Sequence, residues 1–261
     1  NRLMLFFSSC LRILLLSTLQ APGYGMDNIF LNVSGSMKLS SLKDESYEDF
    51  LIKQKNMKWH ECSDLSKYEI KFDNDKLYLF AFNVAQGNCI IIRKGKHIAI
   101  IDAGKARDYS FSDEQKAKLN YVLTHDSPSI DYIFLSHPDD DHCNLIANIG
   151  KSSADTIIKP TKNTKIVVGD NDKTWKKKLQ TYQNNTAYLK KDAPFEIEGV
   201  KFNVYVSSFQ ANAGSLIINM CYKGINSLFL GDSDGTTFEK IRGETGKNII
   251  NLLKSIEQKY D

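Results

Sequence analysis

Short apolar runs alternate with polar segments along most of this chain, and their lengths predict alternating strands and helices. Runs rich in β-branched and aromatic residues predict strands over 77–84, 89–93, 96–101, 130–135, 164–168, 195–206, 215–221 and 227–230. Stretches of mixed polarity predict helices over 112–123, 144–149, 173–182 and 247–259. The first helix starts at Ser112, a residue type that caps helix N-termini. The pattern indicates an α/β fold without internal repeats.

The composition agrees with one large globular domain. The chain has 261 residues, of which 42% are hydrophobic and 25% are charged, enough to bury a sizeable core. We expect this domain to span 71–261, after an N-terminal extension over 26–70. The five cysteines show no C-x-x-C spacing, which argues against a cysteine-based zinc site and against a disulfide framework. Cys143 adjoins a histidine, where we expect a small buried thiol rather than a ligand.

Residues 1–25 have two interpretations. Their apolar stretch is interrupted by Arg12 and followed by small residues, a pattern typical of a secretory signal peptide. The stretch falls short of an unbroken membrane span of about 20 residues, so we expect no stable span after processing. The mature protein is then secreted or extracytoplasmic, whereas it is cytoplasmic if Met26 is the true start. The sequence does not indicate an oligomeric state.

The chemistry is concentrated in the run S-H-P-D-D-D-H at 136–142, which holds two imidazoles and three carboxylates. It follows the predicted strand 130–135, and side chains just past a strand end can converge above the edge of a sheet. A divalent cation accounts for this crowding, because carboxylate and neutral imidazole are its common ligands. The alternative is a solvated acidic turn whose aspartates cap a helix.

This run resembles the H-x-H-x-D-H signature of the metallo-β-lactamase-fold hydrolases. His137, Asp141 and His142 match it, while Asp139 stands where the second histidine usually is. The resulting H-x-D-x-D-H variant is similar to the branch typified by the metallo-β-lactamase domain of the competence protein ComEC.

Four further segments resemble motifs of this family in the same order. They are 82–89 for D-V-G-Q-G-D-A/S, 100–104 for I-D-T-G, 212–217 for N-x-x-S-L-V, and 228–232 for the L-L-T-G-D strand end. Asn83 and Asn88 replace two acids of the first motif. The resemblance spans residues 77–232.

The resemblance implies a four-layer αββα sandwich of two mixed β-sheets, incomplete at the C-terminus. It implies one or two divalent ions, Zn²⁺ or Mn²⁺ with Mg²⁺ also open, held by His137, Asp139, Asp141, His142 and Asp232. The surplus of carboxylate over imidazole favours the harder ions Mn²⁺ and Mg²⁺. Asp141 would also be catalytic, orienting a water that the metal activates. Asp102, Asn212 and Ser215 would support these ligands through hydrogen bonds.

Charge distribution points to an anionic substrate. Residues 151–191 contain ten lysines and three aspartates, a net charge of +7 in a chain whose total is +3. Such a flank would attract a phosphate backbone, although a solvated lysine-rich face explains it equally well. Trp175 and Tyr182 could stack on bases, but their spacing favours the buried side of a helix.

One family feature is missing from the sequence. The last metal-site motif of the ComEC-like branch is P-H-H-G-S, and all five histidines here precede position 143. Either the chain is a fragment, or its site is incomplete and weak or inactive. Three functions stay open: a metal-dependent hydrolase of phosphodiesters in a nucleic acid or nucleotide, a non-catalytic or degenerate binding module for a nucleic acid or protein, and a hydrolase of another bond such as a thioester or lactam.

Overall fold

The computed structural model describes residues 28–33, 59–61, 72–82, 84–85, 87–149, 156–170, 173–206, 215–222 and 225–232. The predicted signal segment 1–25, the predicted helix 247–259 and Asn212 lie outside these residues. None of the described helices is long and apolar enough to span a membrane.

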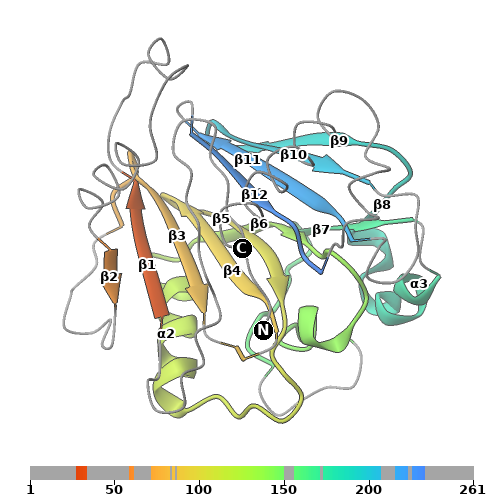
Figure 1. Cartoon of the computed structure of the whole chain (residues 1–261), viewed down its shortest axis with the longest axis horizontal. Coiled ribbons are helices and arrows are strands. Elements are labelled where there is room, and N and C mark those ends of the chain that lie inside the picture. Colours follow the sequence, from red (N-terminus) through yellow and green to blue (C-terminus); the bar gives the residue numbers. More distant parts are fainter. Residues whose placement is uncertain are drawn as a thin grey trace, which may run out of the picture.

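The larger of two sheets has eight strands in the order β2-β1-β3-β4-β5-β6-β7-β8 (Figure 1). Pairing is antiparallel from β2 to β5 and parallel from β5 to β8. The strands are β1 (Asn28–Val33), β2 (Trp59–Glu61), β3 (Leu77–Phe82), β4 (Cys89–Lys94), β5 (His97–Ala103), β6 (Ser129–Phe134), β7 (Lys165–Gly169) and β8 (Thr186–Leu189). The segment 26–70, predicted as an N-terminal extension, contributes β1 and β2 to this sheet.

The smaller sheet has four antiparallel strands in the order β12-β11-β10-β9. They are β9 (Ala193–Ile197), β10 (Val200–Tyr205), β11 (Ile217–Tyr222) and β12 (Ile225–Phe229). The prediction of one strand over 195–206 is wrong. Glu198 and Gly199 have φ angles of 45° and 76°, so the chain turns there into a hairpin. In the described residues only the larger sheet is mixed, whereas two mixed sheets were predicted.

Helix α2 (Asp113–Thr124) begins as the sequence predicts. Ser112 accepts a hydrogen bond from the backbone of Gln115, whose side chain in turn accepts one from the Ser112 backbone, which forms a capping box. The other end of α2 is held by Arg93 of β4, which donates to the carbonyl oxygens of Val122 and His125. This fully buried guanidinium ties the helix to the sheet.

Two other helix predictions need correction. Residues 144–149 form turns, because the backbone N–H of Leu145 donates to Ala103, and its carbonyl accepts from 157 and 158. These long-range bonds replace the helical ones. The helix predicted over 173–182 divides at Leu179 into α3 (Thr174–Lys178) and the 3₁₀ helix η4 (Gln180–Asn185). A second 3₁₀ turn, η3 (Asp140–His142), lies inside the histidine-aspartate run.

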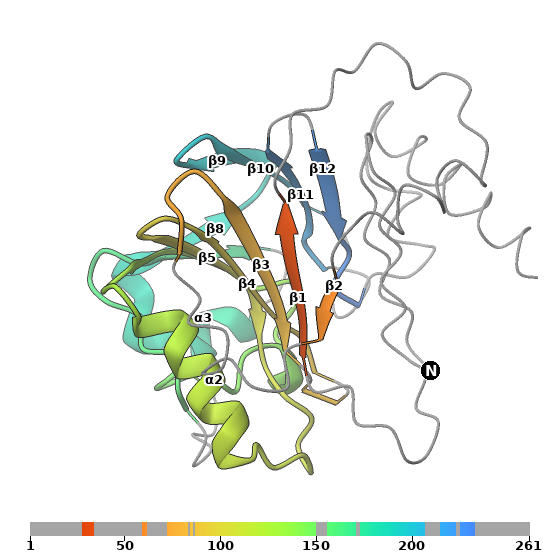
Figure 2. The same cartoon turned by 90° about the vertical axis from the view of Figure 1, so that its left-hand side faces the viewer.

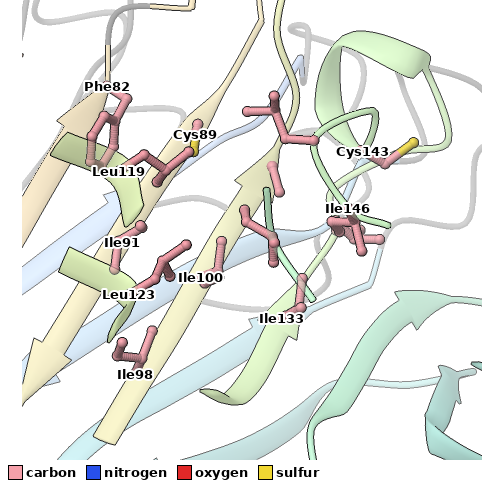
Figure 3. Close-up of a cluster of buried hydrophobic side chains, with 14 of the residues drawn as sticks. Phe82, Cys89, Ile91, Ile98, Ile100, Leu119, Leu123, Ile133, Cys143 and Ile146 are labelled. Carbon is pink, nitrogen blue, oxygen red and sulfur yellow. The ribbon is translucent and has the colours of Figure 1, made fainter. Parts of the chain in front are cut away.

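Side chains of the larger sheet alternate between two hydrophobic cores. One face packs against the smaller sheet, with Leu79, Ile92 and Phe134 meeting Phe202 and others of that sheet. The opposite face packs against α2, where Leu119 and Leu123 lie over Ile91, Ile98 and Ile100 (Figure 3). Figure 2 shows the larger sheet between α2 and the smaller sheet. The fold is thus α/β with two packed sheets, as predicted. The helix predicted over 247–259, which would form the outer layer on the smaller sheet, lies outside the described residues.

Candidate metal centre

Three strand ends meet at one edge of the two sheets. Asp102 lies near the end of β5, and His137 follows the parallel neighbour β6. Asp232 follows β12 of the smaller sheet. Parallel strands end at the same edge, so β5 and β6 bring their polar residues together. Asp102 has a φ of 52°, a left-handed conformation that aspartate tolerates better than most residues.

The side chains of His137, His142 and Asp232 form a compact cluster. One ligand atom from each lies within 4.8 Å of the others. Asp232 has its Oδ1 3.3 Å from His142 Nε2 and its Oδ2 3.7 Å from His137 Nε2. The centroids of the two imidazole rings are 4.0 Å apart. The arrangement points two imidazole Nε2 atoms and a carboxylate at a common space.

This donor set fits a divalent cation. Both Nε2 atoms are buried and make no hydrogen bond, although Asp232 is near. The Asp232 carboxylate lies 3.3 and 3.7 Å from them, and buried polar atoms usually have closer hydrogen-bond partners. Imidazole nitrogen and carboxylate oxygen are ordinary ligands of Zn²⁺ and Mn²⁺. A bound ion would satisfy both nitrogens at once.

Asp102 supports the cluster through hydrogen bonds to His142, Ser136 and Asn88. Its Oδ2 lies 2.9 Å from His142 Nδ1 and accepts hydrogen bonds from Ser136 Oγ at 2.8 Å and Asn88 Nδ2 at 3.0 Å. Its Oδ1 accepts from the Ser136 backbone N–H at 2.7 Å. This fully buried carboxylate is therefore satisfied by four donors. A carboxylate on the far nitrogen of a ligand histidine fixes the ring and raises its basicity.

The two imidazoles differ in charge. Burial favours neutral His142, but Asp102 and Asp232 outweigh it and raise its pKa to about 10. Burial and the neighbouring charge of His142 lower the pKa of His137. Burial opposes ionisation of Asp102, yet the charge and hydrogen bond of His142 lower its pKa below the usual value. Without an ion, His142 therefore carries the positive charge and His137 is neutral.

Glycines allow the loops to approach the cluster. A Cβ added to Gly104 would lie 2.2 Å from the carbonyl oxygen of Asp141, and one added to Gly87 would lie 2.8 Å from it. Gly231 has a φ of 57° and packs against Ser136, where a Cβ would lie 2.6 Å from that of the serine. Any side chain at these positions would displace the backbone that carries the ligands.

The other predicted ligands lie at the margin of the cluster. Asp139 has its Oδ2 3.4 Å from His137 Nε2, and its side chain is 56% exposed. Asp141 is outside the group of three, and its backbone carbonyl accepts from the Asn88 N–H. Ser215 is buried and precedes β11. The structure therefore brings three of the five predicted ligands together and sets Asp139 beside one of them.

Sequence reasoning missed several supporting residues. Ser136 contacts both histidines and Asp102, and Asn88 donates to Asp102 from the position where the similar family motif has an acid. Asn144 accepts from the Lys105 N–H and donates to the Lys105 carbonyl, which joins the loop after β5 to the loop after η3. In the sequence, the asparagine at position 88 in place of the acid of the similar motif was the one signal of such a supporting role. A serine or an asparagine alone gives none.

Among the described residues of the basic segment, Lys178 is the one that contacts the ligand-bearing turn. Lys178 of α3 lies 2.5 Å from Asp140, next to the ligand-bearing turn. Lys176 and Lys190 both lie 3.8 Å from Asp170. Trp175 is 1% exposed and packs in the core, so it is not a stacking platform.

Cys143 is a buried thiol, as expected. Its Sγ donates to the carbonyl of Asp139 at 3.4 Å, and burial raises its pKa to about 12. The thiol keeps its proton and does not belong to the ligand cluster.

Two packed sheets with a histidine-aspartate cluster at their common edge define a metal-binding α/β protein. Residues 82–215 match the family model of the metallo-beta-lactamase superfamily, about half of the chain. The chain belongs to this superfamily, whose members are mostly metal-dependent hydrolases and whose fold binds divalent metals, usually zinc. The comparison with curated proteins finds no match.

Several solved structures are similar to parts of the chain. The metallo-beta-lactamase fold protein YhfI from Bacillus subtilis is 21% identical, with 52% of this chain and 50% of that chain covered and a TM-score of 0.35. The apo chemotaxis sensor ODP from T. denticola is 14% identical, with 55% and 53% covered and a TM-score of 0.37. A probable metal-dependent hydrolase from Staphylococcus aureus is 21% identical, with 64% and 62% covered and a TM-score of 0.36. The matched part of the chain spans about half the length of the first two.

Proposed function

We propose that this chain is a metal-dependent hydrolase of phosphodiesters, with its site at the cluster of His137, His142 and Asp232. One observation carries the proposal: the two Nε2 atoms are buried, lack hydrogen bonds and face the same carboxylate. Histidines kept only for packing would be expected to pair these nitrogens with protein donors or acceptors. Histidines that bind a metal ion instead keep these nitrogens without hydrogen bonds to protein groups.

The proposed ligands are His137, His142 and Asp232, with Asp139 beside His137. A divalent ion bound there supplies Lewis-acid chemistry, which makes water nucleophilic near neutral pH and polarises the scissile bond. Asp102 keeps its charge beside His142 and fixes that ring. Asp139, at the exposed side of the cluster, and Asp141 are the proposed groups for accepting a proton from the attacking water.

The phosphodiester substrate class rests on the basic segment and on the H-x-D-x-D-H spacing shared with the ComEC-like branch. Lys178 joins α3 to the ligand-bearing turn, and Lys173, Lys176 and Lys177 of the same short stretch are exposed. Lysines beside a metal site raise the local concentration of a polyanion and neutralise its phosphates. The expected substrates are a nucleic acid or a nucleotide diester.

The test is hydrolysis of bis(p-nitrophenyl) phosphate and of single-stranded DNA by the 261-residue chain, with Zn²⁺ or Mn²⁺ added and metal content measured in parallel. We expect metal-dependent cleavage that His142→Ala and Asp232→Asn abolish. His97→Ala is the matched control, because His97 begins β5 at the end opposite Asp102, about 17 Å away at 3.3 Å per residue.

Two outcomes would contradict the proposal. A fully metallated protein that cleaves neither substrate has no phosphodiesterase activity, and a binding module or a hydrolase of another bond takes its place. Cleavage that survives both ligand substitutions would mean that the reaction occurs elsewhere.

A further inference from the structure

Ser136 lies at the centre of the hydrogen bonds behind the metal cluster, and its side chain has three polar neighbours. Its Oγ is 2.8 Å from Asp102 Oδ2, 3.1 Å from His137 Nδ1 and 3.3 Å from His142 Nδ1. The residue is 2% exposed, so protein groups must meet its hydrogen-bonding needs.

The Ser136 hydroxyl has one proton, which it can donate to only one neighbour. Asp102 is an ionised carboxylate that can only accept, so Ser136 Oγ–H donates to it. Donation to His137 instead would leave two oxygen atoms facing each other at 2.8 Å without a proton between them. The serine lone pair therefore faces His137 Nδ1, and that nitrogen must carry a hydrogen.

We propose that Ser136 is a positioning residue that keeps the proton of His137 on Nδ1 and so turns its Nε2 lone pair toward Asp232. This inference rests on the metal site of the proposed function. Asp102 does the same for His142 by direct contact at 2.9 Å. Ser136 is the only partner of His137 Nδ1 among the residues that the structure describes. The serine thus extends the orienting effect of one carboxylate to both histidines.

The backbone around Ser136 fixes the direction of its hydroxyl. Its N–H donates to Asp102 Oδ1 at 2.7 Å, and its carbonyl accepts from the Leu216 N–H at 2.9 Å. Gly231 packs against the side chain, where a Cβ would lie 2.8 Å from Oγ. The glycine that precedes Asp232 therefore leaves room for the serine that orients His137.

The proton positions are measurable by long-range ¹H–¹⁵N correlation of the imidazoles in Zn²⁺-loaded, ¹⁵N-labelled protein, with the zinc affinity obtained by chelator competition. In the unsubstituted protein we expect His137 and His142 both protonated at Nδ1 and metal-bound at Nε2. Ser136→Ala should expose the His137 Nδ1 proton to rapid exchange and weaken zinc binding about 10- to 100-fold, leaving the His142 pattern intact. Asn88→Ala, the matched control, also removes a donor from Asp102 Oδ2 but does not contact His137.

Each result decides the inference. Metal bound at His137 Nδ1 in the unsubstituted protein overturns it, as does a Ser136→Ala protein with an unchanged His137 spectrum and zinc affinity within twofold. Failure to take up Zn²⁺ overturns it together with the metal site. Zinc bound through Nε2 of both histidines in a protein that hydrolyses nothing would overturn the hydrolase proposal and uphold this one.

Discussion

Gly104 packs against the peptide bond between Asp141 and His142 so closely that a Cβ on the glycine would lie 2.1 Å from the Asp141 carbonyl carbon. The loop after β5 and the turn that carries His142 therefore share a contact that only glycine permits. Leu145 strengthens it by donating its N–H to the Ala103 carbonyl at 2.9 Å. The position of His142 depends on this contact between two backbones.

Gly104→Ala should lower the free energy of unfolding and weaken metal binding. Relieving such an overlap requires a backbone shift, which costs about 3 kcal/mol or more. Gly199→Ala is the control, because its φ of 76° is strained for alanine but nothing lies within 4 Å of the added Cβ. The control should cost only about 1 kcal/mol and keep its metal affinity. Urea unfolding and chelator competition measure both effects, and equal losses in the two variants would contradict the prediction.

Metal binding should release a proton and strengthen with pH. The pKa of His142 is raised to about 10, so the imidazole is charged at neutral pH and must lose its proton to become a ligand. The apparent affinity should rise up to tenfold per pH unit between pH 6.5 and 8.5, since both values lie below 10. His137, whose pKa is lowered, adds little to this slope. Calorimetry in buffers of different ionisation enthalpy would show about one proton released per ion, and zero release would refute the argument.

The same pKa values predict how the metal-free protein responds to pH. His142 has a raised pKa in the folded state, so its stabilising effect is complete below its ordinary value of 6.5 and is lost as pH rises to about 10. Asp102 has a lowered pKa, so its contribution is present above pH 3.8 and is lost as pH falls further. The unfolding free energy should fall by at most about 1.4 kcal/mol per pH unit above pH 6.5. His142→Gln should remove this dependence in urea titrations at pH 6.5 and 8.5.

Local pattern predicted the ligand-bearing turn because its residues lie within six positions of one another. His137 and His142 come from one loop, and Asp232 follows an apolar strand that ends in Gly-Asp. The spacing of the motif did not show that Asp139 lies beside His137 while Asp141 lies outside the cluster. The positions of these two aspartates depend on the 3₁₀ turn η3. The role of Ser136 depends on the meeting of β5 and β6, which local sequence does not encode.

The errors in the predicted helices and strands also come from contacts between residues far apart in the sequence. The run 144–149 has helical composition, but the backbone of Leu145 bonds to Ala103 and to 157–158 instead. The strand β8 was missed because its four residues carry no alternating apolar pattern and are all half-buried. Long-range hydrogen bonds overrode local propensity in both places. The two cores, by contrast, follow directly from long apolar strands such as β4 and β5.

Asn88→Asp should destabilise the chain increasingly as pH rises. The amide donates to Asp102 Oδ2 at 3.0 Å, and an aspartate there would set a second carboxylate against the first in a buried site. Both groups are charged at high pH and repel, whereas protonation of one at low pH restores a hydrogen bond. The loss relative to the unsubstituted protein should therefore be larger at pH 8 than at pH 5 in urea unfolding. A loss that is independent of pH would contradict the repulsion.

Arg93 should be the most important buried cation for the stability of the described fold. Its guanidinium donates to the carbonyl oxygens of Gly95, Val122 and His125 and lies 3.6 Å from the centroid of the Phe72 ring. Burial lowers its pKa to about 10, which still leaves it charged at neutral pH. Arg93→Ala would remove the donor that the carbonyls of Val122 and His125 share at the end of α2, at a cost of about 3 kcal/mol or more.

Arg93→Lys tests whether charge alone suffices. A lysine keeps the charge but lacks the planar fork that reaches several carbonyls, so it should recover less than half of the loss. Lys96→Ala, an exposed lysine in the turn that follows β4, should change the unfolding free energy by less than about 0.5 kcal/mol. Hydrogen exchange should show faster exchange of α2 amides in Arg93→Ala than in either other variant. If α2 exchanges at the same rate in all three, the guanidinium does not hold the helix to the sheet.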